Sequence, residues 1–264
     1  LVLKGLGYSP KVNVLSVPVT YKSLETGDID VFLGNWMPTM EGDLAAYRDA
    51  GTVEVIQPAN LLGAKYTLAV NKKASDAGLK TFADIAKFKD QLDGEIYGIE
   101  PGNDGNRIIL EMINDNAFEL EGFKVIESSE QGMLSQVSRA KKRDKMVVFL
   151  GWAPHPMNAN FELTYLAGGD DFFGPNFGGA NVFTNTRKNF SSDCPNIGKL
   201  LTNLQFSLPM ENEIMGSILD DYQEPEDAAK KWLKANMTVL DSWLADVTTL
   251  SGDNGLAAVK ASLK

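Results

Sequence analysis

The stretch VFLGNWMPTM at residues 31–40 is nearly repeated as VFLGWAPHPM at residues 148–157. In each copy an apolar run passes through a glycine into an indole, Trp36 or Trp152, and then into a loop that contains proline. The runs are rich in β-forming residues and predict two strands. Because proline restricts the backbone, the pattern predicts that both indoles are held on stiff segments at strand ends.

The composition bounds the size of the core and the choice of partner. The chain has 264 residues, of which 44% are hydrophobic, enough for one large core or two medium ones. No apolar run is long enough to cross a bilayer. The formal net charge of −10 disfavours polyanionic partners, so we expect no nucleic acid to bind. Cys194 is the only cysteine, which leaves no partner for a disulfide within the chain.

Short β-rich runs alternate with amphipathic segments, which is the pattern of an α/β fold with parallel strands. The expected strands cover residues 11–17, 29–34, 52–56, 65–70, 95–100, 123–128, 145–152 and 180–185. Thr81 is a suitable N-cap for a helix whose expected apolar face consists of Phe82, Ile85, Phe88 and Leu92. The C-terminal third of the chain, from Met210, has mostly helical periodicity.

Two similar segments flank the middle of the chain: KYTLAVNKK at residues 65–73 and GGANVFTNTRK at residues 178–188. A chain that crosses from one lobe to the other and later returns would produce this arrangement. We therefore expect residues 72–175 to form one lobe and residues 1–71 with 176–264 to form the other. A ligand would bind in the cleft between them.

The residues needed for catalysis or for a metal site are scarce. His155 is the only histidine, and no G-x-S-x-G motif supplies a nucleophile for it. One histidine and one cysteine do not make a soft-ligand metal site, and no EF-hand spacing occurs. The acidic pairs at 170–171 and 220–221 are better interpreted as surface carboxylates than as an acid/base pair. We expect no enzyme activity, no metal and no cofactor.

The segment GIEPGNDGNR at residues 98–107 lies between an expected strand and an expected helix. It lacks the spacing of the G-x-G-x-x-G and P-loop motifs, so it is weak evidence for a nucleotide site. Asn103, Asp104 and the free backbone N–H groups of the helix start could face the polar end of a ligand. A capped helix start with glycines that satisfy the turn explains the same residues equally well.

The four tryptophans fall into two pairs. Trp232 and Trp243 lie in the amphipathic C-terminal segment and are most simply explained as packing anchors. Trp36 and Trp152 each fall at the C-terminal end of an expected strand, where ligands bind in open α/β sheets. Two indole faces around a quaternary ammonium group would form an aromatic cage. The pattern alone supports this cage and ordinary hydrophobic packing about equally.

Six segments together resemble one protein family: GLGYSPKVNVLSVPVTYKSLETGDIDVFLGNWMPTM, GAKYTLAVN, IYGIEPGNDGNR, ESSEQGMLSQVSRA, VVFLGWAPHPMN and TYLAGGDDFFGPNFGGANVFTN. They resemble the substrate-binding proteins of ABC transporters for choline and glycine betaine, above all the choline-specific branch. The likeness extends over essentially the whole chain. It implies the two-lobed type II periplasmic binding protein fold, closing on a quaternary ammonium compound in the periplasm and delivering it to a membrane permease.

The resemblance also implies roles for four residues. Trp36 and Trp152 resemble two walls of the cage, and Tyr66 of AKYTLA resembles a third. Asn103 of EPGNDGN resembles the residue that forms a hydrogen bond with the choline hydroxyl.

The sequence departs from the family pattern at its beginning. Relatives normally carry a signal peptide, a first strand and a Gly-Trp-Thr-Asp type segment, whereas this chain starts at LVLKGLGY. The absent strand would be central in the first lobe. The family is expected to be monomeric, and a chain lacking that strand is expected to be unstable or to exchange a strand with a second copy.

Three alternatives to choline transport remain at this point. The first is a preference for glycine betaine over choline. The second is a ligand-sensing regulatory domain, since the same two-lobed architecture serves transcriptional effectors. The third is a hydrolase of choline esters, for which neither nucleophile nor base is visible.

Overall fold

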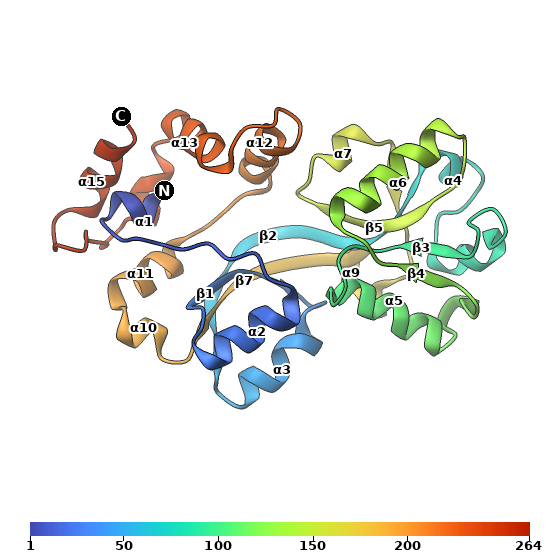
Figure 1. The fold of residues 1–264 in the computed structure, drawn as a ribbon, viewed down its shortest axis with the longest axis horizontal. Coiled ribbons are helices and arrows are strands. Elements are labelled where there is room, and N and C mark those ends of the chain that lie inside the picture. The colour runs from blue at the N-terminus through green and yellow to red at the C-terminus, as the bar shows by residue number, and fades with distance from the viewer.

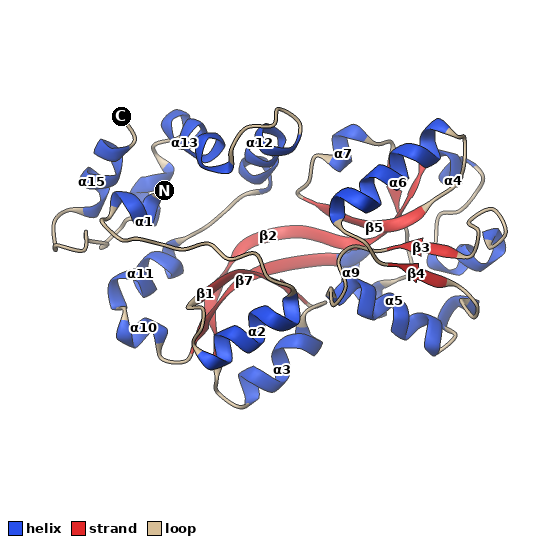
Figure 2. Ribbon diagram, in the orientation of Figure 1, coloured by secondary structure: helices blue, strands red, loops and turns tan.

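The computed structural model describes residues 1–264 and has a mixed α/β architecture (Figure 2). The strands are β1 (Val31–Met37), β2 (Val53–Asn71), β3 (Glu95–Tyr97), β4 (Lys124–Ile126), β5 (Val148–Ala153), β6 (Leu163–Tyr165) and β7 (Gly179–Arg187). The helices of the first half are α1 (Val2–Gly5), α2 (Val17–Thr26), α3 (Glu41–Asp49), α4 (Lys72–Asp76), η1 (Phe82–Phe88), α5 (Asp104–Asn114) and η2 (Ala117–Glu119).

The second half of the chain is richer in helices. They are α6 (Glu130–Lys142), α7 (Met157–Asn160), α8 (Asp170–Phe173), α9 (Pro175–Gly178), α10 (Phe190–Asp193), α11 (Pro195–Asn203), α12 (Leu208–Leu219), α13 (Pro225–Ala235), α14 (Val239–Trp243) and α15 (Gly255–Ser262). The helical periodicity expected in the C-terminal third is confirmed by α12 to α15. No helix is both long enough and apolar enough to span a membrane.

The elements form two lobes that β2 and β7 connect (Figure 1). One lobe contains β1, α2, α3 and the helices near both chain ends, and the other contains β3 to β5 with α4 to α7. The largest apolar cluster contains only residues between Tyr66 and Phe173. The remaining clusters contain only residues up to Ala64 or from Ala180 onward. Each lobe therefore has its own core.

The strands are joined in one sheet with the order β1-β7-β2-β5-β3-β4, and β6 pairs with β2. The expectation of parallel strands is wrong for most of this sheet. Only β3 pairs in parallel, with β4 and β5, whereas β1–β7, β2–β7, β2–β5 and β2–β6 are antiparallel. The reason is the topology: the chain enters the second lobe along β2 and returns along β7, so the two crossings run in opposite directions and pair with each other.

Three of the expected strands require correction. The expected strands at 52–56, from Val53 onward, and at 65–70 belong to one strand, β2, which has register shifts between Ile56 and Ala64. Residues 11–17 form no strand: the segment is extended and unpaired, and α2 begins at Val17. Because no strand of the sheet pairs with it, its alternating valines are not buried; Val12 is 91% and Val14 is 96% exposed.

The helix expected after Thr81 is a 3₁₀ helix that ends at Phe88 rather than continuing to Leu92. The prediction that Thr81 is its N-cap is confirmed by a capping box with Asp84. In this box the Asp84 carboxylate accepts hydrogen bonds from both the backbone N–H and the hydroxyl of Thr81. Phe82 and Ile85 are fully buried in the core of the second lobe, as the apolar face predicts.

The two C-terminal tryptophans differ in burial. Trp243 is 3% exposed in the cluster beneath α11 to α15, and its indole Nε1 donates to the carbonyl of Gln205 at 3.1 Å. Trp232 lies at the edge of the same cluster and donates to the exposed Glu213 carboxylate at 2.7 Å. The expected packing role is thus central for Trp243 and peripheral for Trp232.

We predict that Trp243→Ala lowers the free energy of unfolding by about 3–5 kcal/mol, because it leaves a cavity in a packed cluster. Trp232→Ala should cost only about 1 kcal/mol, since water already reaches part of its ring. Urea unfolding followed by far-ultraviolet circular dichroism measures both values. Equal losses of unfolding free energy in the two variants would contradict the assignment of Trp243 to the core of the cluster and Trp232 to its edge.

Candidate functional site

The structure brings together the three aromatic residues that the sequence marked. Trp36 lies near the end of β1, Trp152 near the end of β5, and Tyr66 on β2 between the two lobes. The Tyr66 ring centroid lies 6.1 Å from that of Trp36 and 6.2 Å from that of Trp152, with interplanar angles of 64° and 72°. Tyr66 and Trp152 are also direct cross-strand partners. The three rings thus come from both lobes and from the strand that joins them.

The orientation of Tyr66 is fixed by the beginning of α5. Its hydroxyl donates to Asn103 Oδ1 at 2.6 Å, and the same oxygen accepts the backbone N–H of Gly105 at 2.8 Å. A Cβ on residue 105 would lie 2.1 Å from the Tyr66 hydroxyl, so only glycine fits there. Burial raises the pKa of Tyr66 well above its usual value, and the ring therefore stays neutral.

Asn103 has two functions at the start of α5. It is the N-cap residue, which satisfies one of the unpaired N–H groups of the first helical turn. Its Oδ1 is fully used by Tyr66 and Gly105, whereas its amide nitrogen donates only to Asp104 Oδ1, at 3.2 Å. One N–H of this amide therefore remains for a further acceptor.

Asp104 has an unsatisfied acceptor in the same place. Its side chain is almost fully buried, at 1% exposure, and Oδ2 has no hydrogen-bond partner. Burial raises the pKa of the Asp104 carboxyl to about 6, and the nearby Thr39 hydroxyl and Arg107 guanidinium offset part of this rise. The Thr39 hydroxyl itself donates to the carbonyl oxygen of Trp36. A buried carboxylate oxygen without a donor is costly unless something else supplies one. The sequence placed Asp104 only among residues that could face a ligand, and its unpaired oxygen depends on tertiary packing.

Phe173 is an aromatic neighbour that sequence reasoning missed. Its ring lies 6.1 Å from Tyr66 at 86°, and its side chain is fully buried. Phe173 therefore supports Tyr66 from within the core and is not itself exposed to a ligand. The signal in the sequence is the aromatic pair of the segment DDFF that precedes β7.

The lobes contact each other beside these residues. Arg107, on α5, donates from Nη2 to the carbonyl oxygen of Thr39 at 3.0 Å and to the Asp43 carboxylate at 3.1 Å. Its guanidinium lies against Gly42, where a Cβ would approach Arg107 Cζ to 3.1 Å. These contacts join the beginning of α3 to α5, so the structure is in a closed arrangement.

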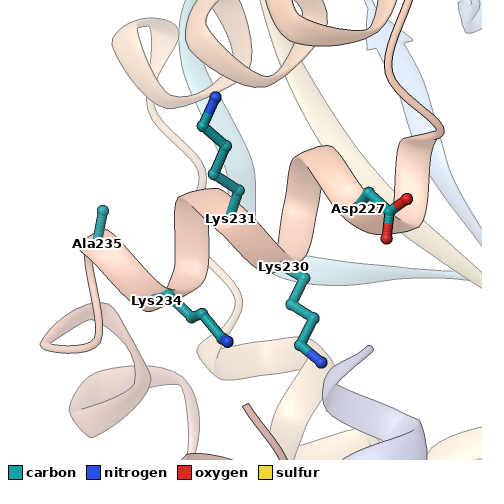
Figure 3. A pocket seen from close by; sticks show the side chains of 5 residues that line it. All are labelled: Asp227, Lys230, Lys231, Lys234 and Ala235. Atoms are coloured by element: carbon teal, nitrogen blue, oxygen red, sulfur yellow. The ribbon is translucent and has the colours of Figure 1, made fainter. Parts of the chain in front are cut away.

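A surface hollow elsewhere on the molecule has the wrong lining for a cation. It lies over α13 and is lined by Asp227, Lys230, Lys231, Lys234 and Ala235 (Figure 3). Lys231 points to the side of the helix away from Lys230 and Lys234, and no aromatic face is present (Figure 3). Three ammonium groups repel a quaternary ammonium ligand, so this hollow does not compete with the aromatic site.

Two solved structures similar to this chain are described as choline-binding proteins of ABC transporters. One, "ABC-transporter choline binding protein in complex with choline", is 62% identical, with a TM-score of 0.98, over 100% of this chain and 91% of that chain. A second, described as in an unliganded semi-closed conformation, is also 62% identical, with a TM-score of 0.90 over 99% of this chain and 91% of that chain. The present structure therefore agrees more closely with the liganded form.

Sequence comparison leads to the same kind of protein. The glycine betaine/carnitine transport binding protein GbuC of Listeria monocytogenes is 29% identical over 164 residues, which are 62% of this chain and 53% of that protein. The family described as "substrate binding domain of ABC-type glycine betaine transport system" matches residues 1–235. This match covers most of the sequence, and its two-lobed type II fold agrees with the structure. The chain therefore belongs to the family of substrate-binding domains of ABC-type glycine betaine transport systems.

Proposed function

We propose that the protein binds choline between its lobes and presents it to the permease of an ABC importer in the periplasm. The observation that carries this proposal is the convergence of Trp36, Tyr66 and Trp152 next to the polar groups of Asn103 and Asp104. The 62% identity to a choline-binding protein supports the same ligand. The proposed site residues are those four that the sequence indicated, Trp36, Tyr66, Asn103 and Trp152, together with Asp104.

Recognition of the ammonium group follows from its weak hydration. A trimethylammonium group cannot donate hydrogen bonds, so moving it out of water costs less than moving a primary ammonium. The negative faces of the aromatic rings then attract it, by ~0.5–2 kcal/mol for each ring once water is excluded. Because Trp36 and Trp152 come from different lobes, the full set of rings faces the cation only when the lobes are closed. Ligand binding thereby favours the closed form.

The end of the ligand opposite the ammonium group distinguishes choline, which has a hydroxyl there, from glycine betaine, which has a carboxylate. A hydroxyl both donates and accepts, so it can donate to Asp104 Oδ2 and accept from the free N–H of Asn103. A carboxylate only accepts, and it would meet the like charge of Asp104 at neutral pH. The unpaired Oδ2 therefore favours an alcohol over a carboxylate.

Glycine betaine is the second candidate. It is supported by the description of the matching family and by the name of the Listeria relative. The N-terminus of α5 also favours a negative group through its free N–H groups. The buried carboxylate of Asp104 at the same helix start opposes this effect, and for that reason we place choline first.

The proposal extends to the organisation of the protein. We propose that residues 1–71 with 176–264, and residues 72–175, are the lobes that move relative to each other. We also propose that the protein acts as a monomer, since Trp36, Tyr66 and Trp152 all come from one chain. It would bind its ligand without converting it, because the site contains ring faces and hydrogen-bonding groups but no nucleophile paired with a base.

The first test is titration calorimetry with choline. We expect saturable binding with choline recovered unchanged, and we expect Trp36→Ala and Trp152→Ala each to weaken binding by ~1–3 kcal/mol through loss of a cation–π face and apolar contact. Trp232→Ala is the matched control, since its ring lies in another cluster, and it should bind as the wild type does. Chemical conversion of choline, or full affinity without either cage indole, would contradict the proposed function.

The second prediction concerns ligand choice. Choline should compete better than glycine betaine in an equilibrium displacement assay with labelled choline, because Asp104 repels a carboxylate. Asp104→Asn removes the charge at nearly constant volume and should bring the ratio of the choline and glycine betaine affinities closer to one. If betaine displaces choline at equal or lower concentration in the wild type, glycine betaine becomes the preferred ligand.

The third prediction is a pH dependence. Lowering the pH through the raised pKa of about 6 protonates Asp104 and removes its negative charge from beside the cation. At pH 5 roughly one Asp104 carboxyl in eleven remains ionised, so choline should bind more weakly than at pH 7.5, by up to about tenfold if only the ionised form binds it. Asp104→Asn should bind with nearly the same affinity at both pH values. An equally steep profile in that variant would assign the titration to another group.

A further inference from the structure

His155 occupies a buried position directly behind the cage. It lies between Pro154 and Pro156 in the loop from β5 to α7, and it is 2% exposed. Its imidazole centroid is 5.0 Å from the Trp152 ring, at an interplanar angle of 70°. The Trp152 ring therefore contacts an imidazole as well as the Tyr66 ring, in both cases in an edge-type arrangement.

Both ring nitrogens of His155 have partners. Nδ1 accepts the backbone N–H of Met157 at 2.9 Å, and Nε2 lies 3.2 Å from Glu130 Oε1. A backbone N–H only donates, so Nδ1 carries no proton and Nε2–H donates to the carboxylate. The two bonds together fix the tautomer and the plane of the ring.

Glu130 connects this loop to a separate helix. It is the first residue of α6, whose N-cap is Ser129, and its side chain is 30% exposed. Negative charge is favourable at a helix start, so the position of this carboxylate is set by α6 and not by the loop. The contact with Nε2 thus ties the loop that follows Trp152 to a rigid element of the same lobe.

The rest of the loop is held in the same way. Asn158 donates from Nδ2 to the carbonyl oxygens of Trp152, at 2.8 Å, and of His155, at 2.9 Å. The Met157 side chain is 1% exposed in the core of the lobe. Within this arrangement the imidazole contacts the Trp152 ring on the side of its own loop, and Glu130 is the one hydrogen-bond partner of that imidazole from a distant part of the chain.

We propose that Glu130 and His155 are positioning residues that set the angle of the Trp152 ring in the cage, and thereby the affinity for a quaternary ammonium ligand. Neither residue needs to touch the ligand. The attraction between a cation and an aromatic ring depends on the cation lying over the ring face, so a tilted indole gives a weaker site. This inference rests on the proposed function and adds to it residues that determine affinity from outside the cage.

The test is a double-mutant cycle with choline affinity as the readout. Glu130→Ala is the primary variant, because its partly exposed side chain can be removed without opening a core cavity. We expect it to weaken choline binding about threefold to tenfold in the wild-type background. In a Trp152→Ala background the same change should alter affinity by less than about twofold, since no ring remains to be positioned.

Two further variants separate positioning from general stability. Glu130→Gln keeps an oxygen that accepts from Nε2 and should retain most of the wild-type affinity. Asp93→Ala breaks the exposed ion pair with Lys145 in the same lobe and should leave affinity unchanged. An equal loss from Glu130→Ala with and without Trp152, or no loss in the folded single variant, would overturn the proposal.

A measurement without ligand keeps this inference separate from the proposed function. Near-ultraviolet circular dichroism of the unliganded wild type and of Trp152→Ala isolates the signal of the Trp152 ring. We expect Glu130→Ala to reduce that signal while the far-ultraviolet spectrum stays the same. An unchanged signal would refute the positioning role even if choline binds, whereas a wild type that does not bind choline would refute the proposed function alone.

Discussion

The constraint on which the site depends is that Tyr66 must face both lobes at once. It does so because β2 is a single strand that pairs with β7 along one part and with β5 along another. Its 19 residues carry the chain from the core of the first lobe into that of the second. Trp36 and Trp152, contributed by the strands at the two ends of this crossing, then meet the same tyrosine ring. A break in β2 would separate the rings even if each lobe stayed folded.

The beginning of α5 supplies the polar groups that lie next to the aromatic rings. The helix start offers N–H groups that Asn103 partly satisfies, and it buries the carboxylate of Asp104 beside them. A buried carboxylate with a free oxygen destabilises the unliganded protein, and a ligand hydroxyl would supply the missing donor. In the proposed complex the same carboxylate would also place a negative charge near the cation. Part of the cost of burying Asp104 is therefore recovered when a ligand with both features binds.

In the proposed site, residues outside the three aromatic rings would determine how those rings are oriented. Phe173 supports Tyr66 from the core, and Gly105 leaves space for its hydroxyl. His155 supports Trp152 in a similar way and is itself held by Glu130. Arg107 joins the lobes from α5 to the beginning of α3, beside the rings. Alanine variants of such residues would change affinity through geometry and not through lost contact with the ligand.

Features that depend on local pattern can be predicted from the sequence. The capping box at Thr81, the helical C-terminal third and the apolar strands before Trp36 and Trp152 follow from residue type and spacing within a few positions. The motifs around Trp36, Tyr66, Asn103 and Trp152 indicated the family, and with it the two-lobed fold. Features that depend on pairing between distant segments cannot be predicted in this way and come from the packing of the whole chain. The direction of the strands, the fusion of residues 53–71 into one strand and the unpaired state of residues 11–17 depend on which strands become neighbours, and local periodicity carries no information about that. The unpaired oxygen of Asp104 and the contact between His155 and Glu130 have the same origin, since both depend on residues far apart in the chain that packing brings together.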